Sequence, residues 1–169
     1  WGRQNGREAG IRTMMDIADR HGVPLTFFLD YPEAELYGED LLDVGREIHR
    51  RGHDLEPHCH AEYLVKRLFG LDDMWAVRLP AATSEQSRAI VDALVERHAG
   101  ITGTAPLAYR SGAYMLGVHY LNALREAGIV LDASYNLLCP ETPMLLGLYG
   151  AFRWRNGLRE LPVPIVPHF

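Results

Sequence analysis

The sequence predicts one α/β domain in which helices cover a mainly parallel β-sheet, either open or closed into a barrel. Its 169 residues, 47% of them hydrophobic, are enough for one domain with a substantial core. Helix-type and strand-type segments alternate along the chain with short connections, as they do in strand–helix–strand units. Residues that carry chemistry follow several of the predicted strands, where the sites of such folds collect.

The first half of the chain contains two predicted helices and two predicted strands. Apolar residues at helical spacing predict a helix that ends at Gly22, and the run VPLTFFLD over 23–30 predicts a buried strand. A second helical pattern over 38–52 ends at Gly52 and precedes a strand over 53–59. The irregular stretch 61–82 that follows is long enough to be a functional loop.

The second half continues the alternation and then changes character. Thr83 and Gln86 have capping-box spacing at the start of a helix that is predicted to close on Gly100. A strand over 106–112, a helix over 117–128 and a strand over 129–136 follow. After a second irregular stretch over 137–150, two extended runs flank Asn156 and Gly157, which predicts a β-hairpin.

Composition excludes several classes of function. A formal charge of -5 and a pI near 5.9 argue against a nucleic-acid binder, and no apolar run approaches the roughly 20 residues of a membrane span. Two cysteines are too few for a disulfide framework. The first ten residues lack a signal-peptide core and the chain starts without Met. We therefore expect residues 1–169 to be a single partial domain of a longer protein, with the cytoplasm favoured.

Polar residues stand at the ends of the predicted strands. Asp30, His58 with His60, Arg110, and Asp132 each follow or end a strand-like run. Because parallel strands present their carboxyl ends to one edge of a sheet, we expect these side chains to converge there.

His58 and His60 form the strongest candidate for a metal site. In an extended chain residues i and i+2 point the same way, so both imidazoles could meet one ion at roughly 2.0–2.1 Å, with Cys59 facing the other way. Zinc-type catalytic sites use three protein ligands, and Asp30 is the residue whose strand end could supply the third. If the chain instead turns helical at His58, Glu62 becomes the second ligand. The alternative is a pair of ordinary histidines at a strand end.

Other residues allow both a structural and a functional interpretation. Arg110 ends an apolar strand and needs an anionic partner, either a structural carboxylate or a catalytic one. Asp132 and Tyr135 fit a place at the same edge, and Trp75 is either a packing anchor or a platform for a sugar ring. Histidines in the last turn of a helix, such as His98, are expected to be imidazolium ions stabilised by the helix dipole.

Four segments carry a resemblance to a known family. HGVPLTFFLD, REIHRRGHDLEPHCH, YRSGAY and LREAGIVLDASYN resemble, in that order, the polysaccharide deacetylase (NodB-homology) family over residues 10–136. His58 and His60 match the metal motif of a divergent H-x-H branch, and Glu62 stands where the more usual H-x-x-x-H motif has its second histidine. Arg110 and Tyr114 match a motif of the R-x-P-Y type, and the stretch from Asp132 resembles the fourth motif.

The resemblance implies a distorted (β/α) barrel, incomplete at both ends here, that removes acetyl groups from N-acetyl sugars of a surface polysaccharide or its precursor. The cofactor implied is a divalent metal, zinc or else cobalt or nickel, and the family's Asp pair would lie upstream of Trp1. The site residues implied are Arg110, Asp132 and His168 for catalysis, Tyr114, Tyr135 and Trp75 for substrate, and His58, His60, Asp30 and Glu62 for the metal. The alternatives are another H-x-H metallohydrolase, of the amidohydrolase type, and an inactive carbohydrate-binding domain. Neither the sugar nor an oligomeric state is predicted.

Overall fold

The computed structural model describes residues 3–4, 7–136, 139 and 150–163. Its α-helices are α1 (Ile11–His21), α2 (Ala34–Tyr37), α3 (Glu39–Arg50), α4 (Val65–Phe69), α5 (Ser84–Thr102) and α6 (Val118–Glu126). Short 3-10 turns are η1 (Tyr31–Glu33), η2 (Ala61–Leu64), η3 (Leu79–Ala81) and η4 (Gly112–Tyr114). The predicted residue His168 lies outside the described residues.

A six-stranded sheet organises the described part of the molecule. Its strands are β3 (Thr26–Asp30), β4 (Asp54–Cys59), β5 (Ala108–Ser111), β6 (Leu131–Asp132), β8 (Arg159–Glu160) and β7 (Phe152–Arg153), in that spatial order. Every neighbouring pair is parallel except β7 with β8. A separate antiparallel pair joins β1 (Arg3–Gln4) to β2 (Arg7–Glu8). The predicted α/β class and parallel sheet are thus confirmed, whereas closure into a barrel stays a prediction.

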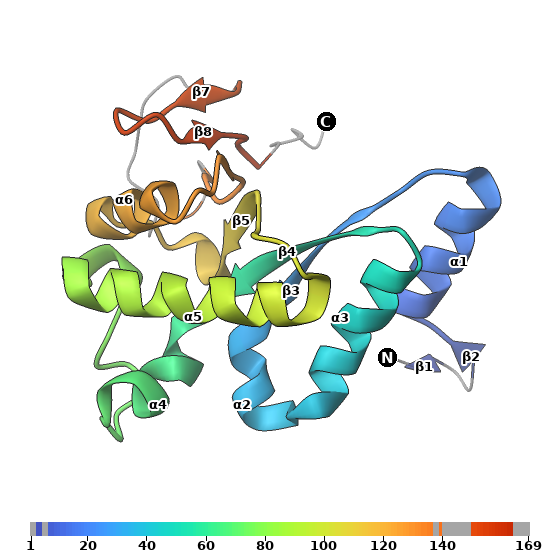
Figure 1. Ribbon diagram of the computed structural model, residues 1–169, viewed down its shortest axis with the longest axis horizontal. Helices are drawn as coiled ribbons and strands as arrows, with labels where there is room; N and C mark the ends of the chain where they lie inside the picture. Colours follow the sequence, from blue (N-terminus) through green and yellow to red (C-terminus); the bar gives the residue numbers. More distant parts are fainter. Residues whose placement is uncertain (1–2, 5–6, 137–138, 140–149, 164–169) are drawn as a thin grey trace.

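Helices α3 and α5 pack on one face of this sheet. Helices α3 and α5 both contact β4, and α6 packs on α5 (Figure 1). Leu29, Leu55 and Cys59 are buried on the covered face. Gly45 of α3 packs so closely there that a Cβ atom at this position would touch the Leu29 and Leu55 side chains. Because side chains alternate along a strand, His58 must lie on the opposite face from Cys59. Cys59 is buried, as the alternation predicted.

Local signals fixed most of the helix ends. Gly22 ends α1 with φ 63°, and Gly52 follows α3 with φ 81°, in the left-handed region that favours glycine. Thr83 and Gln86 form the predicted capping box of α5. The predicted end at Gly100 is wrong, because α5 continues to Thr102 and the left-handed cap is Gly103.

The C-terminal hairpin has the geometry that Asn156-Gly157 predicts. Phe152 pairs with Glu160 across the turn, and Gly157 has φ 88°. The Asn156 side-chain oxygen accepts the Leu158 N–H at 3.0 Å, which stabilises the turn. The hairpin therefore extends the parallel sheet through β8, which pairs with β6.

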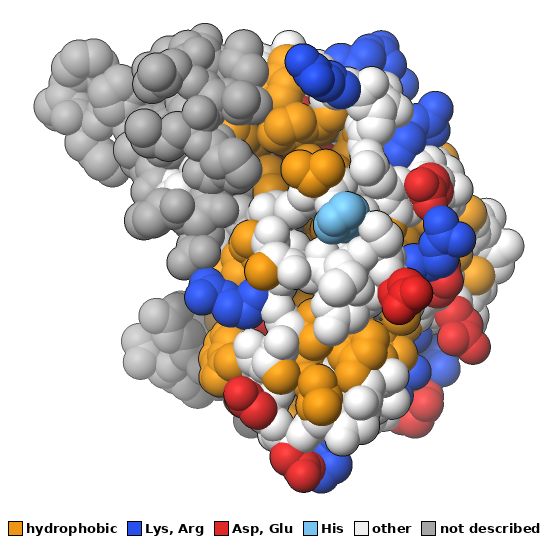
Figure 2. Space-filling view, turned by 90° about the vertical axis from the view of Figure 1, so that its left-hand side faces the viewer, with side chains coloured by type: hydrophobic (Ala, Val, Ile, Leu, Met, Phe, Trp, Pro, Cys, Tyr) orange, Lys and Arg blue, Asp and Glu red, His pale blue; other side chains and the backbone are white. Residues whose placement is uncertain are grey.

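On the side of the molecule where α4 and α6 lie, at the left of Figure 1, hydrophobic side chains are exposed between charged ones (Figure 2). Exposed large hydrophobic residues cluster in sequence between α4 and η3, namely Leu71, Met74 and Trp75. None of the helices in the described residues is both long and apolar enough to span a bilayer.

Candidate metal centre

Three predicted ligands meet at the carboxyl ends of β3 and β4. Asp30 ends β3 and lies in register with His58 of β4, so their side chains share a face. His60 follows β4 by one residue. One ligand atom from each of Asp30, His58 and His60 lies within 4.8 Å of the others, a spacing that one ion could bridge.

His60 is held on two sides. Its backbone N–H donates to Asp30 Oδ1 at 3.2 Å, and its Nδ1 lies 2.9 Å from Glu62 Oε1. The His58 and His60 rings are edge to face, with centroids 5.2 Å apart. Because Glu62 occupies Nδ1, Nε2 is the nitrogen that His60 can offer an ion, and the carboxylate would orient the ring as outer partners of ligating histidines do. The structure thus places Glu62 behind His60 rather than within the three-residue cluster.

The ionisation of the cluster suits a cation. Burial, with a smaller contribution from the neighbouring His60, lowers the pKa of His58 to about 4. Burial also raises the pKa of Asp30 to about 6, against the opposing effect of the His60 N–H. At neutral pH His58 is therefore a neutral imidazole and Asp30 is mostly a carboxylate, the protonation states that divalent metals need.

Arg110 stands beside the cluster. It lies in register with His58 on β5, so its side chain is on the same face of the sheet. Its guanidinium approaches Tyr114, with Nη2 3.4 Å from the hydroxyl oxygen and the central carbon 5.6 Å from the ring centroid. The predicted pair of Arg110 and Tyr114 is thus brought together next to His58.

Asp132 does not join this group. It lies in register with Tyr109, whose neighbour Arg110 points the other way, so Asp132 faces the helix-covered side. It is fully buried and accepts a hydrogen bond from Ser134 Oγ. Burial and the adjacent carboxylate of Glu160 raise the pKa of Asp132 well above its usual value.

Tyr135 and Trp75 have very different surroundings. Tyr135 is fully buried and packs edge-on against Phe152 and Trp154, with ring centroids 5.4 and 6.4 Å away. Trp75 is 55% exposed, and its backbone N–H is held by the Asp73 side chain. Of the two predicted substrate contacts, Trp75 is the one that the structure exposes.

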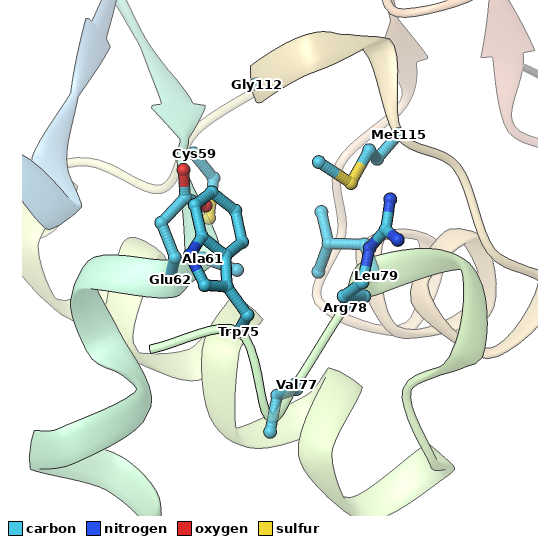
Figure 3. Close-up of a pocket in the computed structure, with 9 residues that line it drawn as sticks. All are labelled: Cys59, Ala61, Glu62, Trp75, Val77, Arg78, Leu79, Gly112 and Met115. Atoms are coloured by element: carbon cyan, nitrogen blue, oxygen red, sulfur yellow. The ribbon is translucent and has the colours of Figure 1, made fainter. Parts of the chain in front are cut away.

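A small hollow lined in part by Glu62 adjoins the cluster. Figure 3 shows the Trp75 indole on one side of it and Met115, Leu79 and Arg78 on the other. Glu62 lines this hollow and also contacts His60, so Glu62 separates the hollow from the cluster. Arg78 was not predicted, because an arginine in an irregular segment carries no sequence signal of its neighbours.

One prediction about the remaining histidines is wrong. His98 is buried, with Nδ1 3.0 Å from the Tyr31 hydroxyl, and burial lowers its pKa to about 4. It is therefore neutral at pH 7 and does not serve as an imidazolium at the end of α5. The packing of α5 on the η1 turn outweighs the helix dipole here.

Comparisons with known proteins are informative through similarity to solved structures. No family model matches the sequence, and no curated protein is similar to it. Among solved structures, the chain is similar to a crystal structure described as a "putative polysaccharide deacetylase from Mycobacterium smegmatis", with a TM-score of 0.64. The two are 21% identical over 90% of this chain and 44% of the other, so this chain spans less than half of that protein. The similarity shows a mixed α/β fold with a mainly parallel sheet, like that of the matched protein, whereas the barrel that the resemblance implied stays a prediction.

Proposed function

We propose that this chain is part of a metal-dependent deacetylase that hydrolyses the N-acetyl group of a sugar in a polysaccharide or its precursor. The observation that carries the proposal is the cluster of Asp30, His58 and His60 at the strand ends. Two imidazoles and a carboxylate are a ligand set typical of hydrolytic zinc sites. The fold similarity to the Mycobacterium smegmatis protein supports the same reaction class.

The donor set fits a divalent ion, zinc or else cobalt or nickel. Such an ion, when bound, polarises the acetyl carbonyl and lowers the pKa of a bound water. Asp30, His58 and His60 would hold it, and Glu62 would keep Nε2 of His60 aimed at it. In this proposal the family's catalytic carboxylate lies upstream of Trp1, and Arg110 orients it from its place beside His58.

Substrate would lie along the face that holds the cluster. Trp75 offers an exposed aromatic surface on which a sugar ring can stack, and Tyr114 adds a hydroxyl beside Arg110. His168, in the role of late proton donor to the leaving amine, remains part of the proposal. Asp132 and Tyr135 would act from behind the site, because both are buried on or near the helix-covered side.

Two other functions use the same residues. An amidohydrolase-type metallohydrolase would also bind metal through His58 and His60 but would not release acetate from N-acetyl sugars. An inactive carbohydrate-binding domain would bind the sugar through Trp75 and lack turnover with any metal. Acetate release therefore separates the deacetylase from both alternatives, and hydrolysis of other amides separates the two alternatives from each other.

The test is acetate release from N-acetylglucosamine oligomers by the full-length protein, stripped of metal and then supplied with zinc, cobalt or nickel. We expect metal-dependent release that His58→Ala lowers by at least roughly 100-fold, the order of loss expected of essential catalytic groups. His119→Ala is the matched control, because His119 is exposed on α6 and bonded to Ser84. Metal-bound protein that hydrolyses other amides but not these would favour the amidohydrolase alternative.

A further inference from the structure

We propose that Gly112 is a positioning residue for His60, because its lack of a side chain leaves the space that the imidazole occupies. The inference rests on the proposed function, since it takes His60 to be a metal ligand. Gly112 lies in the η4 turn directly after β5, whereas His60 follows β4, so the contact joins two neighbouring strand ends.

The space at Gly112 admits no side chain. A Cβ built there would lie 2.7 and 2.8 Å from Cδ2 and Cγ of His60, and 2.6 Å from the carbonyl oxygen of Cys59. Such distances are below any that real Cβ atoms show, so either the ring or the turn would have to move. The backbone of Gly112 is not in the left-handed region, so glycine is required here for space rather than for φ.

Neither neighbour can give way cheaply. The Cys59 carbonyl belongs to β4, whose register with Ser111 is set by the sheet. The His60 ring is tied by Glu62 and its backbone by Asp30. An added methyl group would therefore rotate the imidazole out of its place in the cluster or push the turn away from it.

The turn itself is held in a costly conformation. Ala113 and Tyr114 have φ of 50° and 56°, a region that non-glycine residues rarely adopt. The Ser111 hydroxyl donates to the Met115 carbonyl at 2.7 Å, and the Ser111 N–H donates to Ser134 Oγ at 2.8 Å. Strain of this kind persists where the surroundings determine the backbone, and it gathers at functional sites. In this conformation the turn lies against His60, and the Tyr114 ring lies over the Arg110 guanidinium.

The first experiment measures zinc affinity of the full-length protein by competition with a chromophoric chelator. Gly112→Ala should weaken zinc binding by roughly 10- to 100-fold, the loss typical of residues that orient a ligand. Gly100→Ala is a control that should change nothing, because no atom lies within 4 Å of its Cβ position. Gly117→Ala is a second control: its Cβ would meet the Leu79 carbonyl at 2.2 Å, so it should destabilise the protein without touching His60.

The outcomes separate the inference from the proposed function. Parent protein that binds no zinc contradicts the proposed function and removes the premise of the inference with it. Parent and Gly112→Ala proteins that bind zinc equally overturn the inference and leave the proposed function intact. Equal loss of affinity in Gly117→Ala and Gly112→Ala would also overturn it, because general destabilisation would then explain the effect.

A second measurement needs no metal. Thermal midpoints of metal-free protein are compared for Gly112→Ala in the parent and in a His60→Ala background. Since the ring is then gone, the Gly112→Ala shift should be smaller in the His60→Ala background than in the parent. Equal shifts in both backgrounds would mean that the ring contact does not matter.

Discussion

Replacing Glu160 by Ala should destabilise the protein strongly without touching the candidate metal centre. Glu160 is fully buried, and its carboxylate accepts the Tyr135 N–H and the Trp154 Nε1–H, each at 2.9 Å. Alanine would leave the buried Tyr135 N–H and the partly buried Trp154 Nε1–H unpaired, at about 1–3 kcal/mol each. The free energy of unfolding should therefore fall by about 2–6 kcal/mol, a large share of the roughly 5–15 kcal/mol of a typical domain.

The same carboxylate explains how Asp132 is tolerated in the core. Within the described residues no donor reaches Oδ2 of Asp132, and burial beside Glu160 raises the pKa of Asp132 well above its usual value. Asp132 is therefore protonated in the folded state at neutral pH, beside the Glu160 carboxyl group with which it lies in register. Asp132→Asn keeps a donor at this position and should cost less than about 1 kcal/mol at pH 7.

The pair also has a pH signature of known sign. Unfolded Asp132 loses its proton near pH 4, whereas the folded residue keeps it, so the unfolded state binds fewer protons above that pH. The stability that the pair contributes is thus complete below about pH 4 and is lost as the pH rises. Asp132→Asn should reduce this decline, and burial of Glu160, which raises the pKa of its carboxyl group, accounts for the part that stays.

Denaturant unfolding followed by circular dichroism at several pH values measures all three effects. Thermal midpoints should fall on the order of 10 °C for Glu160→Ala, since about 1 kcal/mol shifts a chain of this size by roughly 2–4 °C. A Glu160→Ala protein within about 1 kcal/mol of the parent would refute the reasoning. An Asp132→Asn protein as unstable as Glu160→Ala would refute the assignment of a proton to Asp132 in the folded state.

Three further predictions concern other residues. Burial lowers the pKa of His98 to about 4, against an ordinary value of 6.5, so neutral His98 stabilises the fold fully above pH 6.5 and this stabilisation is lost as the pH falls toward 4. The stabilisation is at most about 3 kcal/mol. His98→Gln should therefore flatten the curve of unfolding free energy against pH between pH 6.5 and 4. Trp75→Ala should raise KM for N-acetylglucosamine oligomers roughly 5-fold or more, because about 1 kcal/mol of stacking is lost, and should leave the thermal midpoint unchanged. Leu71 is also exposed, and Leu71→Ala should change neither KM nor the thermal midpoint. Glu62→Gln should weaken zinc binding about 10-fold by loosening the His60 ring, and titration calorimetry that finds parental affinity would contradict the role given to Glu62.

The order of the elements was predictable because local signals dominate it. Glycines such as Gly22 and Gly52, the capping box at Thr83 and the Asn156-Gly157 turn act within a few residues of chain. The convergence of Asp30, His58 and His60 followed from strand ends and i, i+2 spacing, which also depend on short stretches.

Features that depend on distant partners were not predictable. The face on which Asp132 lies depends on its register with Tyr109, and a shift of one residue would reverse it. His98 is neutral because Tyr31, 67 residues away, buries it. Gly112 gave no signal either, because its need for space comes from the His60 ring and the Cys59 carbonyl on another strand.

The most direct test of the metal centre is a crystal structure of the full-length protein soaked in zinc, with an anomalous difference map collected at the zinc edge. The geometry predicts one strong peak between β3 and β4, roughly 2.0–2.2 Å from an Asp30 carboxylate oxygen and from one ring nitrogen each of His58 and His60. No peak at saturating zinc, or a peak bound by other residues, would contradict the metal centre and the hydrolytic function proposed for it.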